Sequence, residues 1–389
     1  MTIVIFIIIL GIIVLAHEFG HFITARKSGM KVYEFGVGFP PRAIGFYRHP
    51  NTKKIVWVVG KGKTKLKQTV SGEEMENEEF PATLYSFNWL PMGGFCKIKG
   101  ENGEKAVESD SFGYQKAWKK VIVLAAGVVM NVVLAGVVLG IGFMIGLPTD
   151  LSQGIDDKAI VVQPAEVMIQ AVEKDTPADK AGLKYGDVVL FINNESIKNT
   201  NQMQEKVKNM GGESLQLIIR REKQELSLGI TPSLIKNEQS PRLGVALADA
   251  GIVRYPWYIA LFKGFQAAGI GFVNIMVTFY VLIKGLILGQ GLMFEVSGPV
   301  GIATVVGQGA KLGINYLLNI TAMISLSLAV VNILPFPALD GGRILFILIG
   351  KIIRRPVPLK YEQAAHTLGF LLLMVLFVFI TARDVINLF

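Results

Sequence analysis

The chain has 389 residues, of which 51% are hydrophobic, and its mean hydropathy is +0.46. That composition excludes an ordinary soluble protein of this size and predicts several membrane spans of about 20 apolar residues each. The formal net charge of +9 could suggest nucleic acid as a partner. Lys and Arg gather beside apolar segments, however, as they do in cytosolic membrane loops, so we expect the lipid bilayer and no nucleic acid. The single cysteine, Cys96, excludes an intramolecular disulfide and a cysteine-based zinc cluster.

Four apolar segments predict a polytopic α-helical membrane protein with four transmembrane helices. They cover residues 2–23, 119–146, 315–334 and 364–382. The first is not expected to be a signal peptide, because no basic residue precedes it and Arg26 follows it. The predicted parts are 1–24 (first span), 25–118 (cytosolic or membrane-associated β region), 119–147 (second span), 148–250 (outer domain), 251–314 (interfacial amphipathic helices), 315–342 (third span), 343–363 (cytosolic loop) and 364–389 (fourth span).

The basic residues orient these spans in the cell (cytoplasmic) membrane. Both basic blocks, 24–120 with "KGKTKLK" at 61–67 and the shorter 343–360, should be cytosolic. Both termini and the domain at 148–250 are then extracytoplasmic.

The segment 252–290 is also apolar enough to span a membrane. A fifth crossing would place "HEFGH" (17–21) and "LDGG" (339–342) at opposite faces and move the second basic block outside. We therefore expect helices lying in the outer interface, with Lys263 and Lys284 at the polar boundary.

The first span carries titratable groups in "VLAHEFGHFI" (14–23). His17 and His21 are separated by four positions, so on a helix both rings can face one metal ion. Glu18, beside them, can take a proton from a metal-held water and pass it to the leaving amine. A five-residue pattern can arise by chance, but ionisable groups inside a membrane are costly and are functional by default. The pattern therefore indicates zinc chemistry.

Zinc needs a third protein ligand, and "NILPFPALDGGR" (332–343) offers Asp340. This residue lies at the cytosolic end of the third span, at the same expected depth as His17 and His21. Prolines and glycines around it allow an irregular turn there. The alternative is that Asp340 caps the following helix, which leaves the shared depth unexplained.

Together, "HEFGH", "MGGF" (92–95), "GVVMN" (127–131) and "NILPFPALDGG" resemble the site-2 protease family, in its bacterial regulator-of-sigma-E type. The resemblance implies Zn²⁺ held by His17, His21 and Asp340, with Glu18 as the catalytic base. It also places Asn131 and Asn332 in polar positions near the active site, where we expect substrate contacts. The chain departs from the family at Val128, where a proline is usual, and has room for one outer PDZ module where many relatives have two.

The stretch "LPMGGFCKIKG" (90–100) is typical of a β-hairpin. The resemblance implies that it dips into the membrane and offers a strand edge, at Gly93, Gly94 and Phe95, to an extended substrate segment. The alternative is an ordinary cytosolic hairpin.

Residues 160–232 predict strands and two short helices, and are similar to a circularly permuted α+β PDZ domain. Its groove is expected between the strand near 167–172 and the helix near 200–210, without a clear carboxylate-binding loop. A simple packing domain is the alternative.

The sequence therefore predicts an intramembrane zinc endopeptidase that cuts transmembrane segments of single-span proteins, such as anti-sigma factors or signal-peptide remnants. We expect the 160–232 module to exclude substrates not yet trimmed by an upstream protease of the site-1 type. The alternatives are a catalytically inactive membrane scaffold that presents a PDZ domain, and a surface-acting metalloprotease that hydrolyses soluble loops.

Overall fold

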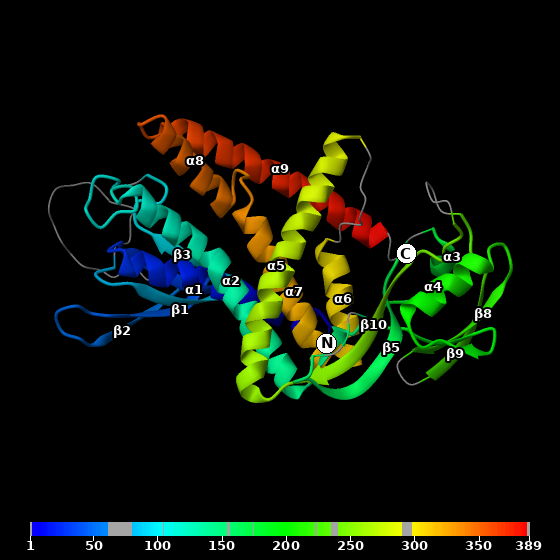
Figure 1. Cartoon of the computed structure of the whole chain (residues 1–389). Coiled ribbons are helices and arrows are strands. Elements are labelled where there is room, and N and C mark those ends of the chain that lie inside the picture. The colour runs from blue at the N-terminus through cyan, green and yellow to red at the C-terminus, as the bar shows by residue number, and fades with distance from the viewer. Residues whose placement is uncertain are drawn as a thin grey trace. The chain divides into compact units, whose positions relative to one another are not determined.

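The structure is a computed structural model that describes residues 2–60, 80–103, 105–152, 154, 156–173, 175–221, 224–234, 240–289 and 298–386. The basic stretch at 61–67 lies outside these residues. The helices, labelled in Figure 1, are α1 (Thr2–Lys27), α2 (Ala117–Ile145), α3 (Pro177–Lys180), α4 (Thr200–Asn209), α5 (Trp257–Ile287), α6 (Pro299–Leu312), α7 (Ile314–Ile333), α8 (Asp340–Ile352) and α9 (Leu359–Ile386). The strands are β1 (Val32–Arg48), β2 (Ile55–Val59), β3 (Leu84–Ile98), β4 (Leu147–Asp150), β5 (Ile160–Val172), β6 (Val188–Ile192), β7 (Glu195–Ser196), β8 (Leu215–Arg221), β9 (Gln224–Ile230) and β10 (Val245–Arg254).

Two compact units divide the chain. The first contains residues 1–136, 267–307 and 321–389, and the second contains 137–266 and 308–320. Helices cover all four predicted spans, as α1, α2, α7 and α9. This is the expected form, because a spanning segment must satisfy its backbone hydrogen bonds internally.

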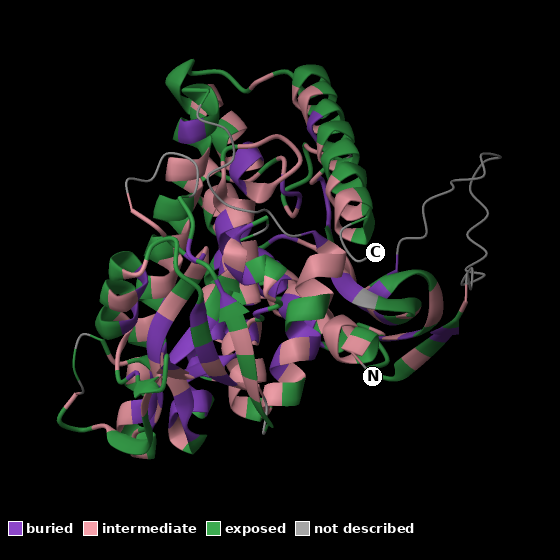
Figure 2. Cartoon of the chain, turned by 90° about the vertical axis from the view of Figure 1, so that its right-hand side faces the viewer, coloured by how far each residue is buried: buried purple, intermediate pink, exposed green. Residues whose placement is uncertain are grey.

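Helix α5 is also long and apolar enough to cross a membrane, as the four helices of the predicted spans are. Among the described residues, five helices are long and apolar enough to cross a membrane, and α5 is one of them. Both α5 and α9 expose apolar side chains along most of their length, and Figure 2 shows α9, which runs toward the C-terminus, as largely exposed. The count of four spans therefore stays a prediction.

In the first unit, α1 and α2 pack against a β-sheet in the order β2-β1-β3. Apolar side chains from all these layers share one core, including Phe22, Val32, Ile98 and Val123. The predicted hairpin within 90–100 is wrong in its pairing. Each residue of Glu34–Val37 in β1 has one partner in 84–87 and another in 94–97 of β3. Residues 94–97 therefore pair with β1, whereas a hairpin within 90–100 would have paired them with residues of that same stretch.

In the second unit, the strands follow the order β4-β10-β5-β6-β8-β9, with β7 paired to β6. A buried core fills this 160–232 module and continues into the segment before β10 at Leu243. The groove predicted between the strand near 167–172 and the helix near 200–210 stays a prediction, but the first two residues of that strand do not offer a free edge. Val167 and Met168 of β5 are paired on both sides, with β10 and β6, so they offer no free edge. Helix α4 also meets β10, where Thr200 donates its backbone N–H to Asp249 at 2.7 Å.

The module joins its neighbouring helices almost without linkers. Helix α2 ends one residue before β4, and β10 ends shortly before α5. Strand β4 pairs with β10, and the N–H of Tyr255 donates to the carbonyl oxygen of Phe143 at 2.8 Å. An ion pair joins Lys263 of α5 to Asp156 at 2.5 Å. The sheet is thus fastened to the ends of both helices.

Candidate active site

Two histidines of α1 present their rings to the same side of the helix. His17 and His21 are one turn apart and both are buried. Their Nε2 atoms lie 3.1 Å apart, and the ring planes meet at 82°. Residues at i and i+4 share one helix face, so both rings point a nitrogen at the same place.

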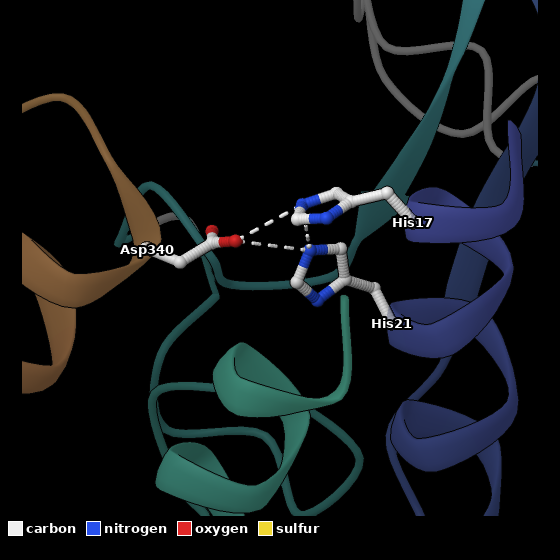
Figure 3. Close-up of side chains that lie close together, drawn as sticks. All are labelled: His17, His21 and Asp340. Atoms are coloured by element: carbon white, nitrogen blue, oxygen red, sulfur yellow. Dashed lines mark hydrogen bonds and ion pairs between the residues drawn. The ribbon is translucent and has the colours of Figure 1, made fainter. Parts of the chain in front are cut away.

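The loop between α7 and α8 brings Asp340 to these rings (Figure 3). Its Oδ2 lies 3.1 Å from Nε2 of His17 and 3.4 Å from Nε2 of His21. Asp340 is the first residue of α8, and Leu339 occupies the N-cap position. The carboxylate is directed at the histidines, which does not support the alternative role as a helix cap.

This loop reaches the histidines because it turns sharply. Pro335 lies just after the end of α7 and cannot donate a helical hydrogen bond. A Cβ on Gly341 would lie 2.3 Å from the Ile333 carbonyl oxygen, and one on Gly342 would lie 2.2 Å from that of Phe336. Side chains at these two positions would collide with the backbone, so both glycines are needed to place Asp340.

Helix α2 contacts the second nitrogen of each ring. Nδ1 of His21 lies 2.8 Å from the Val123 carbonyl oxygen, to which it can only donate. That hydrogen bond leaves the Nε2 lone pair of His21 free for a metal ion. Nδ1 of His17 lies 3.5 Å from Nδ2 of Asn131, whose buried Oδ1 has no hydrogen-bond partner among the described residues. Turning this amide over would let Oδ1 accept a hydrogen bond from the Nδ1–H of His17, which satisfies both groups.

Gly127 leaves the space in which the ring nitrogens converge. A Cβ there would lie 2.6 Å from Nε2 of His21 and 2.7 Å from Nε2 of His17. Those separations are far below van der Waals contact, so a side chain at 127 would occupy the position of a bound ion or displace a ring.

The three ligand atoms fit a zinc ion. Atoms at about 2.0–2.2 Å from one tetrahedral zinc lie roughly 3.3–3.5 Å from one another. Here the three separations between His17, His21 and Asp340 are 3.1, 3.1 and 3.4 Å. Within the described part of the chain, the buried Oδ2 of Asp340 has no hydrogen-bond partner. This is expected of an atom whose partner is a metal ion. Two imidazoles and a carboxylate also leave a fourth position open for water or substrate.

Glu18 follows the first histidine and is half-buried on α1. On this helix it directly follows His17 and precedes His21 by three residues. A carboxylate beside three candidate metal ligands is suited to proton transfer at an ion that they would hold.

Strand β3 passes α1 less than one turn before His17. A Cβ on Gly93 would lie 2.9 Å from Cγ1 of Val14, and one on Gly94 would lie 3.4 Å from Cδ1 of Leu15. The two glycines therefore allow β3 to approach α1 closely. Phe95, next in the strand, is half-buried and pairs with β1.

Asn332 and three groups that the sequence did not single out complete the description of the site. Asn332 is half-buried in the last turn of α7. Sequence reasoning did not single out Gly127, the Val123 carbonyl or His366, which accepts the backbone N–H of Ala338 at 2.7 Å. Gly127 had a signal in the "GVVMN" motif and His366 in its apolar setting, but a backbone carbonyl has no signature in sequence.

Comparison with known proteins identifies the family. The model described as peptidase family M50 matches residues 5–79 and 56–376. The chain belongs to peptidase family M50. This confirms the resemblance to site-2 proteases that the motifs indicated, and the chain is a peptidase of this family.

Two relatives match this M50 chain over nearly its whole length and nearly all of their own. A candidate zinc metalloprotease of Clostridium perfringens is 32% identical over 96% of this chain and 95% of its own. The regulator of sigma-W protease RasP of Bacillus subtilis is 27% identical over 100% of this chain and 99% of its own. Among solved structures, the PDZ domain of an SdrC-like protein from Listeria monocytogenes is 20% identical, with a TM-score of 0.21, over 23% of this chain and 95% of that domain.

Proposed function

We propose that this M50 peptidase is an intramembrane zinc endopeptidase that cleaves transmembrane segments of single-span proteins. The observation that carries the proposal is the triangle of buried His17 and His21 and half-buried Asp340, set in one apolar helix and directly after the loop that follows another. Ionisable groups in such a setting are costly, and a shared metal ion accounts for all three.

His17, His21 and Asp340 would hold the zinc. The bound ion would supply a Lewis acid that polarises the scissile carbonyl and makes an attacking water more acidic. Glu18 accepts the proton of that water and returns it to the leaving amine nitrogen. Val123 and Asn131 fix the ring orientations from α2, so the ligands need little rearrangement when the ion binds.

Substrate must be extended to be cut, since a helix holds its carbonyls in i→i−4 hydrogen bonds. Strand β3 ends the sheet order β2-β1-β3 in the described residues. A segment leaving the bilayer can add to this edge near Gly93, Gly94 and Phe95 through main-chain hydrogen bonds. Asn332 is a further candidate for substrate contact, whereas Asn131, which the motif resemblance also suggested for that role, is fully buried beside His17.

The proposed orientation of the chain in the membrane follows from the two basic blocks, 24–120 and 343–360, which we expect to be cytosolic. Both termini and the 160–232 module then lie outside the cell. Contacts within the second unit support an even number of crossings between β10 and α6. A Cβ on Gly186 of the module would lie 3.0 Å from Leu312 at the end of α6, and Lys184 and Lys311 line one hollow. The chain thus returns to the module after α5, as the four-span arrangement requires.

The 160–232 module is proposed to be a PDZ-like size filter that acts after an upstream protease has trimmed the substrate. Its attachment at β4 and β10 supports this role, because a module fastened to the ends of two helices cannot swing away as one on a flexible linker could. Leu243 and Gly244 directly precede β10, which begins at Val245 and meets α4. Within the module, this short sequence is the one that most resembles a carboxylate-binding loop.

One pair of variants tests the catalytic proposal. Purified Glu18→Gln should keep bound zinc but lose cleavage by roughly 10²–10⁴-fold or more. Asp340→Ala should lose both zinc and cleavage. Wild-type cleavage by Glu18→Gln would disprove the assignment of the base.

Mapping cut sites by mass spectrometry separates the rival functions. Membranes with active enzyme should contain cuts inside apolar segments that are missing with Glu18→Gln. Cuts confined to soluble loops would favour a surface-acting protease. Zinc binding without any Glu18-dependent cut would favour the inactive scaffold.

A further inference from the structure

His366 of α9 takes no part in the proposed zinc triangle, yet it contacts the loop that carries Asp340. Its Nδ1 accepts the backbone N–H of Ala338 at 2.7 Å. Its ring also packs near Phe346 of α8, with centroids 5.5 Å apart. Ala338 stands two residues before Asp340, so α9 and the metal-site loop meet at the histidine.

Ala338 has a backbone conformation that needs support. Its φ of +80° lies in the left-handed region, which residues with a Cβ rarely adopt. Such a conformation persists only when its surroundings hold it there. The neighbouring Pro335 and Pro337 have no N–H to anchor the loop, so the N–H of Ala338 is a natural point of attachment.

A second contact from the same face of α9 lies close by. Gly369 is at position i+3 from His366 and is buried. A Cβ there would lie 2.5 Å from the carbonyl oxygen of Pro337. The helix therefore lies directly against the loop at two successive residues, Pro337 through Gly369 and Ala338 through His366. Both contacts lie immediately before the start of α8.

We propose that His366 is a positioning residue for the metal ligand Asp340. By accepting the N–H of Ala338, it holds the left-handed turn that sets where α8 begins, and hence where the Asp340 carboxylate points. The inference rests on the proposed zinc site. Accepting through Nδ1 requires a neutral ring with its proton on Nε2. That atom is buried and has no hydrogen-bond partner in the parts of the chain that the structure describes.

Three substitutions at 366 separate a hydrogen-bond role from a packing role. His366→Asn places an amide oxygen where Nδ1 stands, His366→Gln places it nearer Nε2, and His366→Leu removes the acceptor while keeping bulk. Zinc affinity is measured by chelator competition on the full chain in detergent. Leu and Gln should weaken zinc binding by about 10–100-fold, the range for outer partners of metal ligands, and Asn should stay close to wild type.

A double variant tests the path through the backbone. Glycine adopts positive φ without strain. Adding Ala338→Gly to His366→Leu should therefore recover part of the lost zinc affinity, whereas a packing defect at 366 would not be repaired. His49→Leu is the matched control, because His49 also accepts backbone N–H groups, from Asn51 and Thr52, but in a different turn.

Asp340→Ala separates failure of this inference from failure of the zinc site. If Asp340→Ala keeps zinc, the proposed zinc site itself is wrong. If Asp340→Ala loses zinc while folded His366→Leu binds it as wild type does, the positioning role is overturned. Should the leucine variant not fold, equal zinc affinity of His366→Asn and His366→Gln overturns it instead.

Discussion

The side-chain amide of Asn131 lies beside the His17 ring nitrogen that is not directed at Asp340, with Nδ2 and Nδ1 separated by 3.5 Å. Asn131 is fully buried, and its backbone carbonyl accepts the Ser325 hydroxyl at 2.8 Å, which ties α2 to α7 at this level. The motif resemblance indicates a substrate contact here, whereas the geometry favours orientation of the His17 ring.

Asn131→Ala should therefore weaken zinc binding, by about 10–100-fold. The physical reason is that the His17 ring loses the partner that fixes its tautomer and direction. Chelator competition on the purified protein measures the effect. Asn332→Ala serves as the comparison and should leave zinc affinity unchanged. Wild-type zinc affinity for Asn131→Ala, with a raised KM, would return Asn131 to a substrate-binding role.

Gly127→Ala should abolish zinc binding or reduce it severely. The added methyl group would lie 2.6 Å from Nε2 of His21 and 2.7 Å from Nε2 of His17, where no carbon atom fits. Gly269→Ala is the matched control in a helix, because a Cβ at Gly269 meets nothing within 4 Å. Zinc content of the two purified variants decides the matter, and normal zinc in Gly127→Ala would refute the assigned position of the ion.

The even number of crossings that we propose between β10 and α6 can be tested by cysteine labelling. In a Cys96→Ser background, single cysteines replace Ala250 and Gln308, or their exposed neighbours Arg254 and Lys311. A membrane-impermeant maleimide should label both positions from outside intact cells, because both belong to the part of the chain that contacts the module. Labelling from opposite sides would show that α5 makes a separate crossing and would defeat the four-span model.

Removing the module should relax substrate choice without harming the zinc site. Asp150 and Ala250 are paired partners in adjacent antiparallel strands, so an Asn-Gly turn can replace residues 151–249 and keep β4 joined to β10. This variant should bind zinc and cut trimmed substrates at the wild-type rate, and should also cut some full-length ones. Equal rejection of full-length substrates by the folded variant would leave the module a packing or docking role, and Glu18→Gln in the same background controls for other proteases.

The placement of the candidate zinc ligands His17, His21 and Asp340 shows where sequence information was sufficient. His17 and His21 share a face because helical periodicity places residues i and i+4 on one side. The span around them is a long apolar segment, and such a segment predicts a helix. Asp340 was predicted from the depth that charge asymmetry and span length impose on the ends of α1 and α7. Local physical rules thus predicted the helices and the candidate metal ligands, and the motif resemblance predicted the family that the comparison confirms.

Tertiary structure decided the pairings and supports that no local rule encodes. Residues 94–97 pair with β1 rather than closing their own hairpin, because strand partners are chosen by packing between distant segments. In the same way, Val123 orients His21 through a backbone carbonyl that any residue type would supply. His366 reaches Ala338 only because α9 packs against the loop before α8, a contact across 28 positions of the chain that side-chain patterns do not record.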